Sequence, residues 1–177
     1  AFGDVLLKLG QSLRDSDAHS GAEAEATLRE AIDLLDRTRS STSLEALVGR
    51  ASLAEVLSDS GRLAGARALL SDVHVEMSTA LEPADPRRLD VAVSLADVLL
   101  SDGDPAAAEA LLEGALPHLV ERHGATGDAA IEALVRLARA IAARSPAEAI
   151  ARLEANQEAT PHPRIAEEID RLRASDG

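Results

Sequence analysis

Two nearly identical segments constrain the fold of this chain more than any other feature. Residues 52–70 read SLAEVLSDSGRLAGARALL, and residues 94–112, which begin 42 positions later, read SLADVLLSDGDPAAAEALL. The same interval separates the members of two further sets, which are Leu53, Leu95 and Leu137, and Leu28, Leu70 and Leu112. The first unit fits with two extra residues in its turn, so that Leu9 is in register with Leu53. Such a period is typical of a repeat protein, whose units bury their apolar faces against their neighbours.

Helix signals divide each repeat into two helices. Capping boxes begin at Ser20 and Thr42, and a capping residue precedes a proline at Asp85, Asp104 and Ser145. Glycines that can end helices follow at Gly61, Gly103 and Gly124. We predict first helices at about 3–16, 43–59, 87–101 and 128–143, second helices at about 21–38, 62–79, 105–122 and 146–157, and a last helix at about 163–174.

The last predicted helix has one apolar stripe, formed by Ile165, Ile169 and Leu172, and charged residues elsewhere. This pattern is expected of a helix that caps the end of a solenoid. Because no stretch alternates with period two, we predict an all-α fold, an α-solenoid of antiparallel helix hairpins with a C-terminal capping helix. The chain is then a single domain, 1–177, with units at about 3–38, 43–79, 87–122 and 128–157.

Composition excludes several classes of partner. Apolar residues make up 46% of the chain, enough for a packed core, and the net charge of -13 disfavours nucleic acid and anionic membranes. There is no cysteine and no signal peptide, and no apolar run is long enough to span a bilayer. We therefore expect a cytoplasmic protein. Since the chain begins at Ala1, we also expect an excised domain or a processed chain. Lys8 is the only lysine among 18 Lys and Arg residues, which favours a bacterial source of high GC content.

The repeat resembles the tetratricopeptide repeat, whose pattern needs Leu and a small residue near positions 7 and 8, a large apolar residue at 11, and small residues at 20 and 27. The third unit supplies these as Leu95, Ala96, Leu99, Ala108 and Ala115. The small residues Gly10, Ala54, Ala96 and Ala138 should mark close helix crossings. The period of 42 resembles the variant found in kinesin light chains and in bacterial regulatory proteins. The aromatic positions of the family are filled by aliphatic residues and Arg50, and Phe2 is the only aromatic residue.

The resemblance implies that the first helices line a concave groove that binds a partner. The groove positions carried over from the family are Lys8, Gln11, Arg14, Ser52, Glu55, Asp59, Asp90, Ser94, Asp97, Ser101, Arg136 and Arg139. Acids and hydroxyls occupy the middle of this series and cations occupy its two ends, so a protein or peptide partner with a basic centre would fit. The same residues are also what the solvated helix faces of an ordinary acidic protein present. The chaperone-docking carboxylate clamp is excluded, because it needs Asn where this chain has Gln11, Glu55, Asp97 and Arg139.

No motif indicates catalysis, a cofactor or a metal. His118 and Glu121 share a helix face, but His123 lies about 140° round the helix from His118. No nucleophile elbow or phosphate-binding loop occurs. The sequence thus predicts a non-catalytic interaction scaffold, part of a larger bacterial regulatory protein. Two alternatives stay open: a structural solenoid that associates with itself, and an accessory domain of an enzyme such as a protein kinase.

Overall fold

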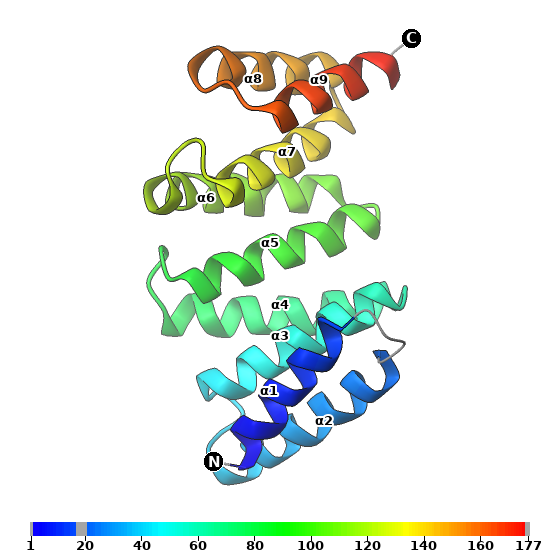
Figure 1. Ribbon diagram of the computed structural model, residues 1–177, viewed down its shortest axis with the longest axis vertical. Helices are drawn as coiled ribbons and strands as arrows, with labels where there is room; N and C mark the ends of the chain where they lie inside the picture. Colours follow the sequence, from blue (N-terminus) through cyan, green and yellow to red (C-terminus); the bar gives the residue numbers. More distant parts are fainter. Residues whose placement is uncertain (1, 17–20, 176–177) are drawn as a thin grey trace. The chain divides into compact units, whose positions relative to one another are not determined.

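The computed structural model describes residues 2–16 and 21–175, and this part of the chain contains nine α-helices and no strand (Figure 1). The helices are α1 (Phe2–Arg14), α2 (Gly21–Thr38), α3 (Leu44–Asp59), α4 (Leu63–Ala80), α5 (Pro86–Ser101), α6 (Pro105–His123), α7 (Asp128–Ala142), α8 (Pro146–Ala159) and α9 (Pro163–Ser175). Each predicted helix is present, and its ends lie within two residues of the predicted ones. The predicted all-α class is confirmed.

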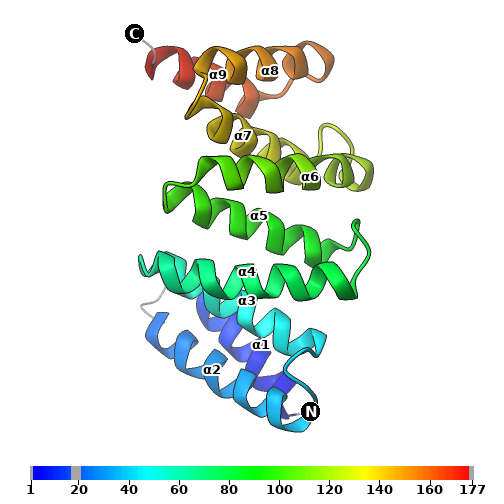
Figure 2. The same cartoon turned by 180° about the vertical axis from the view of Figure 1, so that it is seen from behind.

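The chain divides into two compact units, residues 1–82 and 83–177. In the first unit α1 pairs with α2 and α3 with α4, while α2 and α1 also contact α3 (Figures 1 and 2). In the second unit the hairpins are α5–α6 and α7–α8, and α9 contacts both α8 and α7. Within each unit the first helices are therefore neighbours, and α9 lies where the first helix of a further hairpin would lie. The expected single domain stays a prediction.

Side-chain caps begin several helices as predicted, with one correction. The side chains of Asp85, Asp104 and Ser145 accept hydrogen bonds from backbone N–H groups of the first turns of α5, α6 and α8. The cap of α3 is Ser43, whose side chain accepts from the backbone N–H of Ala46, so the prediction of Thr42 was wrong by one residue. Leu44 is the first helical residue, and the cap is the residue directly before it. The predicted cap Ser20 lies outside the described residues.

The helix ends also follow the sequence. Gly61, Gly103 and Gly124 have φ angles of 75°, 82° and 78°, a region that only glycine enters without strain. All three glycines were predicted from the sequence as helix stops, and each follows the last residue of its helix within two positions.

The repeated leucines and small residues form the core. Leu28, Leu70 and Leu112 are each 0% exposed, and so are the small residues Ala54, Ala96 and Ala138. At Gly10 the helices approach so closely that an added Cβ would lie 2.7 Å from Leu28 Cγ. The small residues of the predicted crossings are thus buried, and at Gly10 even an alanine side chain would be too large.

Leu9 is an exception to the burial of the repeated leucines. Leu53 and Leu137, its equivalents, are 4% and 0% exposed, but Leu9 is 48% exposed. The reason is its position in the stack: α3 packs on the preceding helix α2 and α7 on α6, whereas α1 packs only on α2 and α3, which follow it. One side of α1 thus has no covering helix in the described part of the chain.

Ion pairs on the second helices join successive repeats inside each unit. Arg62, at the start of α4, binds Glu25 of α2 through two nitrogens at 3.0 and 2.5 Å, and Arg29 binds the same carboxylate. The hydrogen bond from Arg62, followed by that from Arg29, lowers the pKa of Glu25 to about 2. Arg144, two residues before the start of α8, holds Glu109 of α6 at 2.8 Å in the same way.

Candidate interaction face

In the first unit, side chains of α1 and α3 predicted to line a groove bind each other. The Gln11 Nε2 donates to the Ser52 Oγ at 3.0 Å, and the Ser52 residue is only 4% exposed. One turn further along, the Arg14 guanidinium forms an ion pair with Glu55. Both links join residues 41 positions apart, close to one repeat. These side chains therefore connect the two first helices of the unit, α1 and α3, and some of them remain partly exposed to solvent.

The second unit repeats this arrangement between α5 and α7. The Arg136 Nε donates to Asp97 Oδ1 at 2.5 Å, and its Nη1 lies 3.4 Å from Glu132 Oε1 on its own helix. The Arg136 side chain is 20% exposed, whereas those of Asp97 and Glu132 are 45% and 51% exposed. One guanidinium thus serves two accessible carboxylates, and this part of the face keeps a residual negative charge.

The opposite imbalance exists between α7 and α9. Arg139 binds Glu168 through two hydrogen bonds, Nε to Oε1 at 2.9 Å and Nη2 to Oε2 at 2.8 Å. The Arg171 guanidinium lies 3.5 Å from the same carboxylate. The Glu168 side chain is 5% exposed. Burial works against the charged form of Glu168, but the hydrogen bonds and charge of Arg139 outweigh it and lower its pKa. Two guanidinium groups share one carboxylate here, which leaves a residual positive charge.

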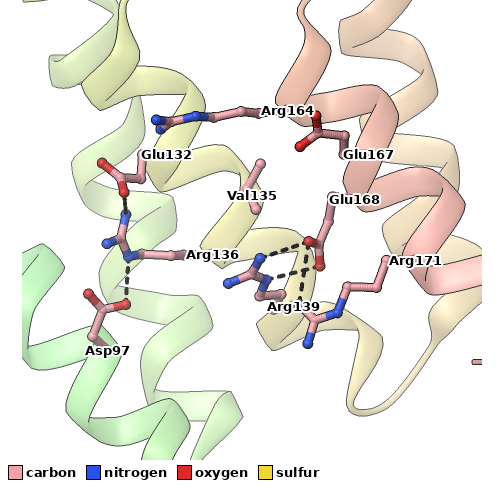
Figure 3. A pocket seen from close by; sticks show the side chains of 9 residues that line it. All are labelled: Asp97, Glu132, Val135, Arg136, Arg139, Arg164, Glu167, Glu168 and Arg171. Carbon is pink, nitrogen blue, oxygen red and sulfur yellow. Dashed lines mark hydrogen bonds and ion pairs between the residues drawn. The ribbon is translucent and has the colours of Figure 1, made fainter.

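A pocket of about 460 Å³ lies between these two charge clusters (Figure 3). It is lined by Asp97, Glu132, Val135, Arg136, Arg139, Arg164, Glu167, Glu168 and Arg171. Figure 3 shows Arg164 extending from α9 toward the α7 side of the pocket, above Val135. In the described part of the chain, neither the Arg164 guanidinium nor the Glu167 carboxylate has an ion-pair partner. The pocket is hydrophilic and of mixed charge, which suits a polar segment of a protein more than an apolar small molecule.

The structure joins six of the predicted residues in three pairs, Gln11–Ser52, Arg14–Glu55 and Asp97–Arg136, and leaves others separate. Lys8 and Asp59 are exposed and have no ion pair within residues 2–16 and 21–175. Asp90 also keeps solvent exposure, yet crowding by protein atoms desolvates its carboxyl and raises its pKa. The Ser101 Oγ donates to the backbone oxygen of Asp97, and Ser94 is half-buried on α5.

Sequence reasoning missed the contribution of α9. Its stripe Ile165, Ile169 and Leu172 is buried as predicted, but the helix also supplies Glu168 and Arg171 to the first-helix face. The order of the helices could have predicted this contribution. In a solenoid, a helix that follows the second helix of a hairpin packs in the place of the next first helix. Its polar residues could therefore have been placed on the same face.

Two negative findings concern other kinds of site. Among the described residues, no group of three His, Asp or Glu side chains is arranged to hold a metal ion. In the same residues, no helix is both long enough and apolar enough to cross a membrane.

The hairpin order, the buried small residues at the crossings and the adjacent first helices define an α-solenoid of tetratricopeptide-like repeats. Among solved structures, the chain is similar to the putative kinesin light chain of Podosopora anserina, described as having nearly identical TPR-like repeats. The identity is 22%, the TM-score is 0.87, and the match covers 98% of this chain and 86% of that chain. A variant of the same protein with one substitution matches with the same values.

A second solved structure is BtubC (BKLC) from P. vanneervenii, with 17% identity, a TM-score of 0.60, and coverage of 98% of this chain and 79% of that chain. No protein-family model matches the chain. No curated protein sequence matches it. At these identities the similarity establishes the fold, and the predicted tetratricopeptide-like repeat of the kinesin-light-chain kind is confirmed. The predicted bacterial source stays a prediction.

Proposed function

We propose that this chain is a non-catalytic interaction module that binds a peptide or helix of a partner protein on its first-helix face. The fold supports a scaffold role, because stacked helical hairpins present long continuous surfaces on which partners bind. The observation that carries the proposal is the pocket of the second unit, where charged side chains line about 460 Å³ of accessible space. Exposed, unevenly paired charges on a preformed hollow are suited to a charged segment of a partner.

The charge distribution indicates which partner segment fits this pocket. Asp97 and Glu132 share Arg136, so a basic side chain from the partner would complete the pairing there. Arg139 and Arg171 share Glu168, so an acidic side chain would fit on the α9 side. We therefore propose a segment with a basic centre, as the sequence predicts, followed by an acidic residue toward α9.

Affinity capture from the source organism, with the whole chain as bait, tests the proposal. The informative variant is Glu132→Arg, because Glu132 is exposed and its only ion pair among the described residues is the long one with Arg136. The matched control is Glu113→Arg on α6, an equally exposed glutamate that also binds one arginine, at 3.1 Å. We expect loss of the captured partner with Glu132→Arg and retention with Glu113→Arg. Equal capture by both variants would show that the first-helix face of this unit is not the binding face.

Glu55 and Asp97, two of the acids that the sequence places in the groove, are less suitable for charge reversal. Each forms an ion pair with an arginine of the neighbouring first helix, Arg14 and Arg136 respectively. A reversal would place two guanidinium groups together and weaken the packing of the unit, so a loss of binding would have two explanations.

We also propose where this module acts and to what kind of protein it belongs. A cytoplasmic location, membership of a larger bacterial regulatory protein, and an accessory role beside a catalytic domain such as a protein kinase are all compatible with a scaffold. The full-length gene decides among them: a catalytic domain in the same reading frame would support the accessory role, and a short gene without one would remove it.

A further inference from the structure

A second hollow continues the first-helix face beyond the pocket of Figure 3. It has a volume of about 570 Å³, and it shares five lining residues with that pocket: Asp97, Arg136, Arg139, Glu168 and Arg171. It also includes later residues of each helix, Leu100 of α5, Ala142 of α7 and Leu172 of α9. The two spaces therefore form one groove, which runs along α7 toward the carboxyl ends of the three helices.

This groove lies inside the second unit and not at an end of the stack. The helix α7 contacts α5 on one side and α9 on the other, so it lies between them (Figure 1). Figure 3 shows the Arg171 side chain extending from α9 toward Arg139, on the side of Glu168 that faces away from Arg164. Both walls and the floor of the groove thus come from packed helices of this chain, and no further helix is needed to form it.

The two parts of the groove differ in chemistry. The residues that line only the first pocket are three charged residues and Val135, whereas those that line only the second hollow are uncharged: Leu100, Ser101, Ala142, Leu172 and Ser175. Both hydroxyls already donate to backbone oxygens, Ser101 Oγ to that of Asp97 and Ser175 Oγ to that of Leu172, each at 2.9 Å. Because the second hollow offers aliphatic surface and no charge of its own, it suits an apolar side chain.

The repeat shows that this apolar surface is not required by the fold. Leu100 is half-buried on α5, and the residue 42 positions before it, at the same place on α3, is the equally half-buried Ser58. A polar side chain is therefore tolerated at this position of the first-helix face. The leucine adds apolar surface where hairpin packing does not demand it, which favours a role in binding.

The length of the groove fits an extended segment. Glu132 lines its beginning and Ala142 its end, and these residues are ten positions apart on α7, which is about 15 Å along the helix axis. In an extended chain alternate side chains point to the same face, and four residue steps span about 13 Å. Three alternate side chains can therefore reach the carboxylates of Asp97 and Glu132, the guanidinium of Arg171, and the second hollow.

We propose that the second hollow binds an apolar side chain of the partner segment, two residues beyond its acidic residue and four beyond its basic residue. The segment then has the pattern basic–x–acidic–x–apolar, in which x points away from the groove. The acidic residue binds between the two spaces to Arg171, whose side chain is 66% exposed and lies 3.5 Å from Glu168. This inference rests on the proposed function, to which it adds the apolar residue and the spacing.

Fluorescence anisotropy of labelled synthetic peptides, titrated with the whole chain, tests the proposal. The probe is Lys-Ser-Glu-Ser-Leu flanked by Gly and Ser, made in both chain directions because the groove determines the order of the three groups and not the direction of the backbone. The control peptide has serine in place of leucine. We expect the leucine peptide to bind about tenfold more tightly, since its leucine is buried in part on binding.

A variant that fills the second hollow locates the bound leucine. Ala142→Gln places a polar side chain there, and Ala143→Gln is the matched control, because the adjacent Ala143 is exposed and lines neither space. Ala142→Gln should reduce the affinity for the leucine peptide about tenfold and leave that for the serine peptide unchanged, whereas Ala143→Gln should change neither. Equal losses for both peptides would overturn the proposal, because general damage to the unit has that effect. Far-UV circular dichroism checks that both variants remain helical.

Glu132→Arg separates the failure of this inference from the failure of the proposed function. It should weaken both peptides equally, because it acts on their basic residue. If the leucine and serine peptides bind equally and Glu132→Arg weakens both, the apolar site is wrong and the proposed face stands. If Glu132→Arg changes neither, or if no peptide binds at up to about 1 mM, both proposals are wrong. A dimer of the chain alone that Ala142→Gln abolishes would assign the hollow to a second copy and would also overturn the inference.

Discussion

The buried carboxylate of Glu168 provides a quantitative test of how α9 is attached to the second unit. Glu168→Gln keeps the size of the side chain but replaces one acceptor oxygen by an amide that repels the Arg139 guanidinium. One of two charge-assisted hydrogen bonds, at 2.9 and 2.8 Å, is then lost. Such a bond contributes about 1.5–3 kcal/mol. Because the Arg139 side chain is 46% exposed and regains water, we expect a loss of about 1–2 kcal/mol in the free energy of unfolding.

Urea denaturation followed by far-UV circular dichroism at pH 7 measures this loss. With a slope of about 2 kcal/mol per molar urea, the midpoint should fall by about 0.5–1 M. The control is Glu167→Gln on the adjacent residue, which is exposed and has no ion pair among the described residues. It should shift the midpoint by less than about 0.25 M, since surface substitutions stay within about 0.5 kcal/mol. Equal midpoints for the two variants would refute the assignment of Glu168 as the anchor of α9.

The pH dependence gives this prediction a definite sign. Burial raises the pKa of Glu168, but the hydrogen bonds and charge of Arg139 dominate and the net pKa is lowered. A lowered folded-state pKa means that the stabilisation is complete above the unfolded pKa of about 4.3 and is lost as the pH falls through the folded value. The difference between wild type and Glu168→Gln should be constant between about pH 6 and 8 and shrink below about pH 4.

Two further predictions concern other parts of the chain. Gly10→Ala should destabilise the first unit by about 1–3 kcal/mol, since its Cβ would lie 2.7 Å from the Leu28 side chain of α2. Gly114→Ala, in an open part of α6, should stabilise the protein by about 0.5–1 kcal/mol. Thermal unfolding measures both effects, and a shift of the unfolding temperature in the same direction for the two variants would contradict this prediction. NMR titration of the Glu25 carboxyl should give a pKa of about 2, and Arg62→Gln should raise it toward the ordinary 4.5. The corresponding stabilisation is complete above pH 4.5 and is lost as the pH falls toward 2.

The fold could be predicted because its determinants are local and repeated. The caps at Asp104 and Ser145 and the turn at Gly103 depend on a few neighbouring residues, which the sequence displays directly. The burial of the repeated leucines follows from periodicity alone. The exposure of Leu9 could not be predicted in this way, because periodicity describes a position within the repeat and does not show whether a preceding helix covers it.

The candidate site was predicted less completely, because its contacts join residues about 30 to 40 positions apart. The sequence places Arg14, Glu55 and Asp97 on one face, but it does not show that Arg14 reaches Glu55 or that Arg136 reaches Asp97. These pairs depend on the lateral distance and relative shift of neighbouring helices, which only the packed structure defines. The sequence separates cations at the ends of the predicted groove from acids in its middle. In the structure, arginines instead bind acids within each unit.

This internal pairing determines how a partner could gain affinity and specificity on the first-helix face. A half-exposed pair such as Arg136–Asp97 contributes at most about 1 kcal/mol, so exchange of its carboxylate for a ligand group is inexpensive. The nearly buried Glu168 is different, because breaking its bonds to Arg139 would leave its charge with little water and only the longer ion pair with Arg171. Discrimination between partners should therefore depend on charges that the fold leaves incompletely paired, Glu132 and Arg164. A substitution at these positions should change which segment binds without loosening the helices that present it.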